Sequence, residues 1–281
     1  MGRQRRRVSD LAAHLERYGI KYFPDDDAYW KWGGTALDLK TARQIERYMW
    51  AHADGKVTPS QTRRFYDLIA TPAVASVVHS KKADAIRASG QAVADRIGSA
   101  RRVLDLGCGL GYLTTYYAIV NPSRRVLGCD ASQKTMHHAD VLAKKFGIPN
   151  VEFLHWNTNE PLPAGPWDTV VSTQFFSELN SHDTLLGDIA SQLADDGMIV
   201  SVDAFGTQVA AEHFRAAAAE NGLQLSRFDW CRFSDFGSFQ AYPIMVLTPG
   251  VGPAGPSFDL GREWETMLAE IEDREDAVRQ S

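Results

Sequence analysis

The stretch "VLDLGCGLGY" at residues 103–112 determines how the rest of the chain is interpreted. A hydrophobic run of strand length ends there in three glycines at alternate positions, Gly107, Gly109 and Gly111. Glycine lets the backbone turn sharply, and a turn that leads into a helix places a ligand against free amide groups. The stretch therefore predicts a buried strand, a ligand-binding turn and the start of a helix, in that order.

The spacing of these glycines departs from the dinucleotide-binding pattern. That pattern is Gly-x-Gly-x-x-Gly with an acidic residue about 20 positions further on, and Tyr112 stands where its third glycine belongs. Asp105 precedes the turn, and its negative charge suits a ligand that carries a cation better than it suits a pyrophosphate. Asp130 ends the next apolar run, where it can accept hydrogen bonds from two ribose hydroxyls. The pattern disfavours a nicotinamide oxidoreductase.

Short apolar runs alternate with amphipathic stretches of helix length from residue 101 onward. The runs are 103–106, 126–129, 151–154, 169–172 and 198–202. This alternation is typical of βαβ units and of a parallel sheet covered on both faces. Two further runs, 224–233 and 241–247, are joined by "SDFGS", which is too short for a crossover helix, so we expect an antiparallel pair that closes the sheet. Pro243 is expected at the start of the last strand or at a bulge.

The first hundred residues contain helical patterns and few strand-like ones. Helices are predicted over 8–18, 37–53 and 73–97, and from Thr58 onward. The segment "KYFPDDDAYWKWGG" at 21–34 is rich in aromatic residues and is expected to be irregular. We therefore predict a helical lobe and substrate lid over residues 1–100, before a sheet core over 101–249.

The C-terminal part, 250–281, is predicted to be a linker followed by an amphipathic helix. "PGVGPAGP" at 249–256 has the composition of a linker. Trp264, Met267, Leu268 and Ile271 then recur at helical spacing, which predicts a helix with one apolar face. We expect that face to pack on the body of the protein, or else on a second subunit, and a homodimer through the N- or C-terminal helices stays open.

Composition and charge narrow the classes of function. Hydrophobic residues make up 44% and charged residues 23% of the 281 residues, as in an ordinary globular protein. The net charge of −5 gives no argument for nucleic acid or an anionic membrane. No apolar run approaches the length of a membrane span, and no signal sequence follows the N-terminal arginines. The three cysteines fit neither a disulfide framework nor a zinc spacing, so we expect a cytoplasmic protein.

"VLDLGCGLGYLT" followed by "VLGCDAS" resembles the first two motifs of the class I S-adenosylmethionine-dependent methyltransferases. The resemblance covers about residues 101–248. It implies an α/β fold with a Rossmann-like, seven-stranded, mostly parallel sheet that ends in an antiparallel strand pair, and S-adenosyl-L-methionine as the cofactor. The residues that it assigns to the methionine portion of the cofactor are Asp105, Gly107, Gly109 and Gly111, and it assigns Asp130 to the ribose.

The resemblance implies further cofactor contacts outside these motifs. Ala131 would flank the adenine, and Asn157, with Thr158 beside it, takes the place of an acidic residue that accepts from the adenine amino group. An amide oxygen can accept the same bond, but Asn157 can also be a turn residue that satisfies its own backbone. Gln174 ends the fourth strand, where ligands of open α/β sheets bind. Tyr66 could cover the methionine end, or pack between lobe and core.

Catalysis by this family requires little beyond alignment. A sulfonium is already a potent methyl donor, so the protein chiefly aligns an acceptor and excludes water. A base is needed only if the acceptor must lose a proton. The candidate bases are Glu178 and His182, although His182 could simply be a surface residue beside the next helix. No acidic ligand follows the fourth strand, so we expect no metal.

The acceptor is expected to contact the N-terminal lobe. Tyr22, Phe23, Tyr29 and Trp30 lie in the aromatic segment and could stack on a planar acceptor or enclose a cationic amine. The alternative is that about half of these rings only hold the lid in place. The lid resembles that of methyltransferases of specialised metabolism that act on small aromatic or indole-type acceptors, and carbon, nitrogen and oxygen acceptors all remain open.

Two other functions stay open at this point. A methyltransferase acting on RNA or protein would need a basic groove or an Asn/Asp-Pro-Pro-Tyr-like motif, where this chain has "STQFF", and the charge balance opposes nucleic acid. A non-catalytic cofactor-binding protein is disfavoured because Asp105, the glycines and Asp130 are all present.

Overall fold

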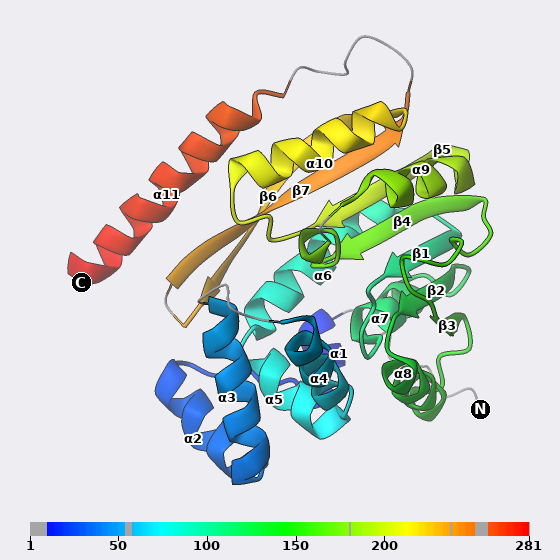
Figure 1. The fold of residues 1–281 in the computed structure, drawn as a ribbon. Coiled ribbons are helices and arrows are strands. Elements are labelled where there is room, and N and C mark those ends of the chain that lie inside the picture. The colour runs from blue at the N-terminus through cyan, green and yellow to red at the C-terminus, as the bar shows by residue number, and fades with distance from the viewer. Residues whose placement is uncertain (1–9, 54–57, 180, 237, 251–257, 281) are drawn as a thin grey trace, which may run out of the picture.

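The computed structural model describes residues 10–53, 58–179, 181–236, 238–250 and 258–280. Its centre is one seven-stranded sheet with the strand order β3-β2-β1-β4-β5-β7-β6 (Figure 1). The strands are β1 (Arg102–Leu106), β2 (Arg125–Asp130), β3 (Val151–His155), β4 (Trp167–Thr173), β5 (Leu193–Val202), β6 (Leu223–Asp235) and β7 (Ser238–Pro249).

The direction of the strands agrees with the prediction from the sequence. Strands β1 to β5 pair in parallel, whereas β7 is antiparallel to both β5 and β6. The predicted α/β fold with a terminal antiparallel pair is therefore confirmed. Because parallel strands end at the same edge of the sheet, the turns after β1, β2 and β4 come together there.

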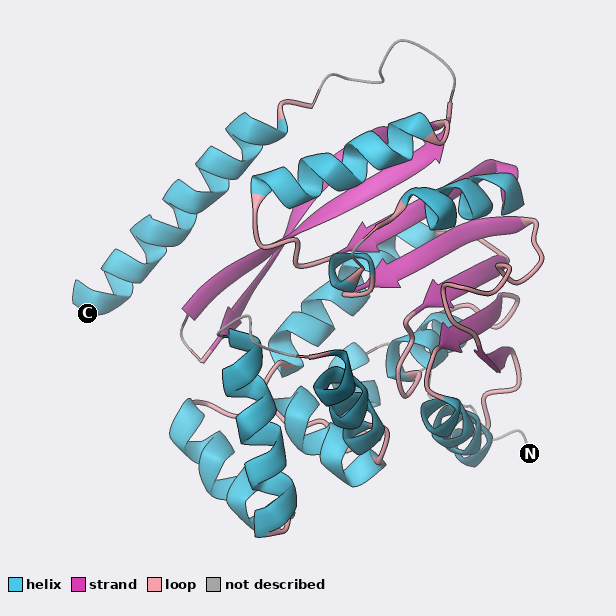
Figure 2. Ribbon diagram, viewed as in Figure 1, coloured by secondary structure: helices cyan, strands magenta, loops and turns pink. Residues whose placement is uncertain are grey.

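Helices cover both faces of the sheet (Figure 2). They are α6 (Ala83–Ile97), α7 (Tyr112–Val120), α8 (Gln133–Phe146), α9 (Asp183–Gln192), α10 (Gln208–Glu220) and α11 (Leu260–Gln280). Neighbouring residues of a strand point to opposite faces, so Val170 joins the hydrophobic cluster that includes α9 and α10, while Val171 joins the cluster of α6 and α7. This double burial explains why the strands are continuous apolar runs.

The N-terminal lobe is helical, as predicted. Its helices are α1 (Leu11–Glu16), α2 (Asp26–Ala36), α3 (Leu39–Ala53), α4 (Pro59–Ile69) and α5 (Pro72–Ser80). The Thr58 hydroxyl and the Gln61 side chain cap each other's backbone at the start of α4, a capping box that fixes where this helix begins. Helices α2 to α5 gather beside the turn of the β6–β7 hairpin (Figure 1).

Two predictions for the lobe were wrong. The segment 21–34 is irregular only as far as residue 25. Asp25 accepts a hydrogen bond from the Ala28 amide at 2.7 Å and caps α2, which then continues through both glycines. The predicted single helix over 73–97 is two helices, α5 and α6. The chain turns after Ser80, whose hydroxyl accepts a hydrogen bond from the amide of Lys21 at 2.8 Å, so a tertiary contact fixes the break.

Two further predictions, one for Pro243 and one for the apolar face of the last helix, failed near the C-terminus. Pro243 lies inside β7, opposite Trp230 of β6, and away from the bulge between Leu225 and Arg227. The pairing of β5 with β7 ends at Ile244, so β7 has one free edge at Pro243, and proline is tolerated on such an edge.

Helix α11 packs on β7 and α10 mainly through its buried Leu260 and Met267, while Leu268 is 51% exposed. The apolar face predicted for this helix is therefore narrower than expected. Residues 251–256 of the predicted linker lie outside the described part of the chain. None of the described helices combines the length and the apolar character that crossing a membrane requires.

Candidate active site

The glycine turn lies between β1 and α7, and its three glycines all adopt positive φ angles. The angles are 67° at Gly107, 53° at Gly109 and 71° at Gly111, in the left-handed region that favours glycine. A Cβ at Gly107 would lie 2.6 Å from Phe175, and one at Gly111 would lie 2.4 Å from Phe153. A Cβ at Gly109 would meet nothing within 4 Å. Packing therefore requires two of the glycines, and the third borders open space.

Asp105 lies under this turn, buried within β1 with 3% of its surface exposed. The Thr114 hydroxyl of α7 donates a hydrogen bond to its Oδ2 at 2.6 Å. Burial raises the pKa of Asp105 to about 7, against the opposing effect of Thr114. A carboxyl group with a raised pKa is stabilised in its charged form by a nearby cation, so this position fits the ammonium end of a ligand.

Asp130, at the end of β2, holds the turn from the other side. Its Oδ2 accepts from the Gly109 amide at 3.1 Å, and its Oδ1 accepts from the Ser132 amide at 2.9 Å. A carboxylate has about four positions for accepting hydrogen bonds, so acceptor capacity remains for ribose hydroxyls. Burial raises the pKa of Asp130. Ala131 follows it, and its carbonyl accepts from the His155 ring at 3.1 Å.

The residues expected after the third strand to contact the adenine, Asn157 and Thr158, are not held in an arrangement that points to a ligand. The Oδ1 of Asn157 accepts from the Asn159 amide at 3.0 Å, which is the turn arrangement that we gave as the alternative. Thr158 is exposed. The adenine roles of both residues stay predictions, since a carbonyl oxygen can accept a second hydrogen bond.

Tyr66 reaches this edge of the sheet from α4 in the lobe. Its side chain is 41% exposed. Burial raises the pKa of Tyr66, and the charges of Glu178 after β4 and of Asp130 at the end of β2 add to that rise. The cofactor-covering role of Tyr66 stays a prediction.

The turn after β4 carries the other predicted residues. Gln174 has a φ of 63°, which is uncommon for a residue other than glycine. Its backbone amide donates a hydrogen bond to the Val202 carbonyl at 3.1 Å. A short helix, η1 (Phe176–Glu178), follows, and Glu178 is exposed on it. The His182 Nε2 donates to the Phe176 carbonyl at 2.9 Å, so this ring holds the turn in place.

The sequence did not predict the carboxylate that fixes this turn. Asp203 follows β5, is fully buried, and accepts from the hydroxyls of Ser172 at 2.8 Å and Ser201 at 2.6 Å. It also accepts from the Ser177 amide of η1 at 3.2 Å. Burial raises the pKa of Asp203. Only its place after a strand could have indicated it, because the three serines converge through folding alone.

A second unpredicted contact links the lobe to the glycine turn. The hydroxyl of Tyr112, the first residue of α7, lies 3.0 Å from His79 Nδ1 of α5. Burial lowers the pKa of His79 to about 4, so the ring is neutral and can accept from the phenol. A cavity of about 290 Å³ adjoins this pair and Leu110.

Most of the aromatic residues predicted to bind the acceptor pack on one another. The cluster comprises Phe23, Tyr29, Trp30 and Trp32, and is called the α2 aromatic cluster below. Tyr29 is 4% exposed and its hydroxyl donates to the Val77 carbonyl at 3.2 Å. Its ring lies 5.9 Å from Phe236 in the β6–β7 turn.

The chain's own lysines lie over two rings of this cluster. Lys81 Nζ lies 4.8 Å from the Trp30 ring, and Lys21 Nζ lies 4.8 Å from the Trp32 ring. Trp30 is 54% exposed. Tyr22 lies apart and packs against the cluster of α6 and α7. Acceptor binding by these residues stays a prediction, with Trp30 the most accessible of them.

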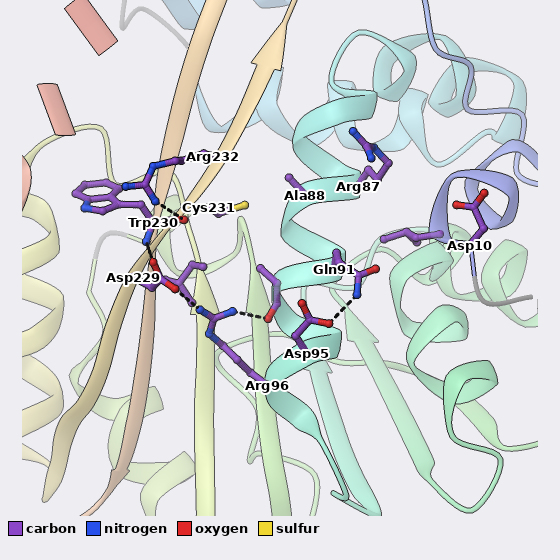
Figure 3. A pocket seen from close by; sticks show the side chains of 13 residues that line it. Asp10, Arg87, Ala88, Gln91, Asp95, Arg96, Asp229, Trp230, Cys231 and Arg232 are labelled. Carbon is purple, nitrogen blue, oxygen red and sulfur yellow. Dashed lines mark hydrogen bonds and ion pairs between the residues drawn. The ribbon is translucent and has the colours of Figure 1, made fainter. Parts of the chain in front are cut away.

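A cavity of about 460 Å³ lies away from this edge, between α6 and β6 (Figure 3). Some of its polar side chains pair with one another: Arg96 bonds to Asp229 at 2.8 Å, and Gln91 bonds to Asp95 at 2.7 Å. Two buried nitrogens of its lining, Nε of Arg96 and Nε1 of Trp230, have no hydrogen-bond partner among the described residues. Within the described ranges, no group of three or more His, Cys, Asp or Glu side chains could hold a metal ion.

Comparison with known proteins agrees with this geometry. A family described as "Methyltransferase domain" matches residues 97–249, just over half of the chain. Trans-aconitate 2-methyltransferase of Azoarcus sp. (strain BH72) is 29% identical over 103 residues, which cover 37% of this chain and 39% of that protein. (S)-coclaurine N-methyltransferase of Thalictrum flavum subsp. glaucum is 28% identical over 104 residues, covering 37% and 29%.

The chain thus spans about a third of the length of these curated relatives. Among solved structures, the cyclase SpnF has a TM-score of 0.50 at 16% identity and covers 62% of this chain and 82% of that one. This likeness concerns the fold alone.

Proposed function

The chain belongs to the class I S-adenosylmethionine-dependent methyltransferases, and on that premise we propose that it methylates a small aromatic acceptor without a metal ion. When bound, S-adenosylmethionine would supply a sulfonium methyl group that the acceptor attacks in line, while the bond from sulfur to that methyl group breaks and S-adenosylhomocysteine leaves as a neutral thioether. The observation that carries the proposal is the pair of carboxylates, buried Asp105 and half-buried Asp130, on either side of a turn that borders open space at Gly109.

The residues of the sheet edge would hold the cofactor. Asp105 would face its ammonium, the backbone at Gly109 would allow close approach, and Asp130 would accept from the ribose. Tyr66 would close this site from the lobe and keep water out. Gln174, at the end of β4, would lie beside the reacting group.

An aromatic acceptor is supported by the rings that α3 and α4 bring to this edge. Tyr48 and Phe65 stack with centroids 3.9 Å apart and an interplanar angle of 5°, and Phe65 meets Tyr66 at 5.9 Å. Since Tyr66 remains partly exposed, a planar ring could pack against it. Trp30 could add to the binding surface only if Lys81 moved from its face.

Of the two candidate bases, the geometry favours Glu178. Its carboxylate is exposed, and its charge raises the pKa of the Tyr66 phenol. By contrast, the Nε2 of His182 donates its hydrogen bond to the Phe176 carbonyl. Glu178 could take a proton from an acceptor that loses one during transfer. His182 would then position the turn.

The remaining predictions concern the oligomeric state of the protein, its location and its partners. A homodimer stays a prediction, and the exposed Leu268 of α11 would be a contact for it. A cytoplasmic location, a role in specialised metabolism and the absence of a nucleic-acid partner also stay predictions.

Labelled methyl transfer tests the proposal. The protein would be incubated with S-adenosylmethionine carrying a labelled methyl group and with a metabolite extract, and the products analysed by mass spectrometry. We expect the label in a small aromatic molecule. Label in RNA or protein would support the macromolecular alternative, and no transfer despite cofactor binding would support a non-catalytic protein.

A further inference from the structure

A cavity lies behind the glycine turn, between the end of α1, helix α5 and helix α8, and is called the α1–α5–α8 cavity below. Its volume is about 290 Å³, at the small end of the range of roughly 300–1,000 Å³ that ligand pockets occupy. Leu110 of the turn and Tyr112 of α7 form part of its wall, and further apolar surface comes from Ile20, Pro72 and Leu142. The cavity therefore offers room for one small molecule with an apolar body.

The α1–α5–α8 cavity lies apart from the side of the turn that carries the two carboxylates of the candidate cofactor site. Helix α8 begins at Gln133, just after Asp130, and runs back toward the opposite edge of the sheet, where the parallel strand β3 starts. Leu142 and Lys145, which line the cavity, belong to the last turns of α8. At 1.5 Å per residue, Leu142 is about 13 Å along the helix from Gln133. The cavity is therefore a separate place that shares only the glycine turn with the cofactor site.

The charges that line the α1–α5–α8 cavity are positive. Arg17, which follows α1, and Lys145 of α8 lie in its wall, and none of its described lining residues is a carboxylate. A third basic residue of the wall, His79, is neutral because burial lowers its pKa to about 4. The cavity between α6 and β6 differs, because three arginines and three aspartates line it. The α1–α5–α8 cavity therefore favours an anionic ligand.

The two cations lie around one aromatic ring and lack ion pairs. The Arg17 guanidinium lies 4.2 Å from the centre of the Phe146 ring, and Lys145 Nζ lies 5.9 Å from the centre of the same ring. Neither cation forms an ion pair with a described residue, whereas the neighbouring Lys144 pairs with Asp140. Like charges near one ring repel each other, and an anion that contacts both would relieve that repulsion.

Hydrogen bonds connect the walls of the cavity to the start of α7. The hydroxyl of Tyr112 donates to His79 Nδ1 of α5 at 3.0 Å. The hydroxyl of Tyr18, another residue of the wall, lies 2.6 Å from Thr115 Oγ1 in the first turn of α7. A ligand that packs against Leu110 and Tyr112 would stabilise the glycine turn in the conformation described above. Occupation of the cavity and binding of the cofactor would thus favour the same conformation.

We propose that the α1–α5–α8 cavity is an effector site for a small aromatic molecule with one anionic group, and that its occupation strengthens cofactor binding at the glycine turn. The anionic group contacts Arg17 and Lys145, and the aromatic body packs against Leu110 and Tyr112. By linkage, the cofactor strengthens binding of the effector by the same factor. The coupling rests on the proposed function, because it concerns the cofactor of that reaction, whereas the anion site itself does not.

Small aromatic probes of similar shape test the charge preference of the site. Phenylacetate and phenyl phosphate carry the anion as a carboxylate and as a phosphate, phenylacetamide is neutral, and phenethylamine carries a cation. Ligand-observed NMR titrations with the full chain would measure the dissociation constants. We expect the better of the two anions to bind about tenfold more tightly than the amide and the amine. Which anion binds better identifies the effector as a carboxylate or as a phosphate.

Variants of the two cations locate the binding. Arg17→Gln and Lys145→Gln should each weaken binding of the better anion about three- to fivefold, the size of effect expected for a solvent-accessible charge. Lys144→Gln is the matched control, because Lys144 belongs to the same helix but pairs with Asp140 and does not line the cavity. This control should leave the dissociation constant unchanged.

Calorimetry with S-adenosylhomocysteine tests the coupling. Binding to the wild type should become about fivefold tighter when the better anion is present at a saturating concentration. The gain should be smaller in the variant that carries both Arg17→Gln and Lys145→Gln, at the same concentration of the anion. Without the anion, this variant should bind S-adenosylhomocysteine as the wild type does.

The contrary outcomes are distinct. Equal affinities for the anions, the amide and the amine would overturn the anion site, and so would equal losses in Lys144→Gln and Arg17→Gln. Displacement of the anion by S-adenosylhomocysteine would also overturn it, because the probe would then occupy the cofactor site. An unchanged affinity for S-adenosylhomocysteine would overturn the effector role. A wild type that binds the anion but no S-adenosylhomocysteine would overturn the proposed function and the coupling, while its charge-dependent binding would still support the anion site.

Discussion

The glycine turn and the α2 aromatic cluster use their side chains in opposite ways. At the turn, Asp130 keeps acceptor capacity after bonding to two backbone amides, and open space adjoins Gly109. In the cluster, the rings contact one another and lysines lie over Trp30 and Trp32. Both regions are rich in residue types that bind ligands. Unused acceptor capacity therefore favours the glycine turn over the cluster as the candidate binding site.

The largest effect should come from Gly111→Ala in the glycine turn. Its Cβ would meet Phe153 at 2.4 Å, at a φ of 71°. Left-handed strain of about 1–2 kcal/mol and overpacking of about 1–3 kcal/mol should lower the free energy of unfolding and abolish cofactor binding. Chemical denaturation and calorimetry would measure both.

Gly109→Ala is the matched control for this prediction. Because its Cβ meets nothing within 4 Å, the free energy of unfolding should fall by the strain of about 1–2 kcal/mol alone. Cofactor affinity should still fall, because the new methyl group would project toward the ligand. Identical stabilities for the two alanine variants would contradict the described packing of Phe153.

Protonation of Asp105 should make cofactor binding depend on pH. Its pKa is raised to about 7 by burial, and an ammonium binds the ionised form. The dissociation constant should rise by up to about tenfold per pH unit below about 7. Asp105→Asn should bind weakly at every pH and show a flat profile. A wild-type profile that is flat between pH 6 and 8 would contradict the role of Asp105.

The same pKa affects the stability of the ligand-free protein. The pKa in the folded state lies above its ordinary value of 3.8, so the folded protein binds more protons than the unfolded chain. The stabilisation from this group is complete at pH values below about 4 and is lost as the pH rises through about 7. The melting temperature of the wild type minus that of Asp105→Asn should fall over this range. A rising difference would refute the assigned direction.

A moderate effect is expected for Asp130→Ala. Removing the carboxylate should weaken cofactor binding by about 1–3 kcal/mol, because ribose hydroxyls and the Gly109 amide would lose a partner. Asp203→Asn is the control, since Asp203 is a buried carboxylate of the same edge that bonds to serines. Calorimetry on both should find the loss only in Asp130→Ala. Equal losses would argue against a ribose contact.

The smallest effect is expected for Trp30→Ala in the α2 aromatic cluster. Its exposed ring could contribute about 0.5–1 kcal/mol to binding of a cationic or aromatic acceptor, so KM for the acceptor should rise a few-fold while cofactor affinity is unchanged. Tyr66→Ala should instead weaken cofactor binding. If Trp30→Ala lost cofactor affinity, the cluster would lie over the donor and the comparison above would be reversed.

The sequence predicted the sheet well because strand burial leaves a local signature. Continuous apolar runs mark β1 and β4, and the short "SDFGS" connection requires an antiparallel pair. The failures depend on single contacts. The side chain of Asp25 caps a helix in a segment whose Pro and Gly-Gly predicted an irregular conformation. The Lys21 amide bonds to Ser80 at the point where one longer helix was expected to continue.

The candidate cofactor site could be proposed from the sequence only where its residues lie in one or two short stretches. Asp105 and the glycines belong to one stretch, and Asp130 ends the next strand. Asp203 and His79 could not be found in this way, because they bond to residues of elements far apart in the chain. Their roles depend on tertiary packing, which periodicity does not encode.

Calorimetric titration of the wild type with S-adenosylmethionine, S-adenosylhomocysteine and NAD(H) tests the central claim most directly. The account predicts binding of both sulfur ligands, no binding of NAD(H), and a large loss for the sulfur ligands in Asp105→Asn. Preferential binding of NAD(H), or no heat with either sulfur ligand, would contradict it.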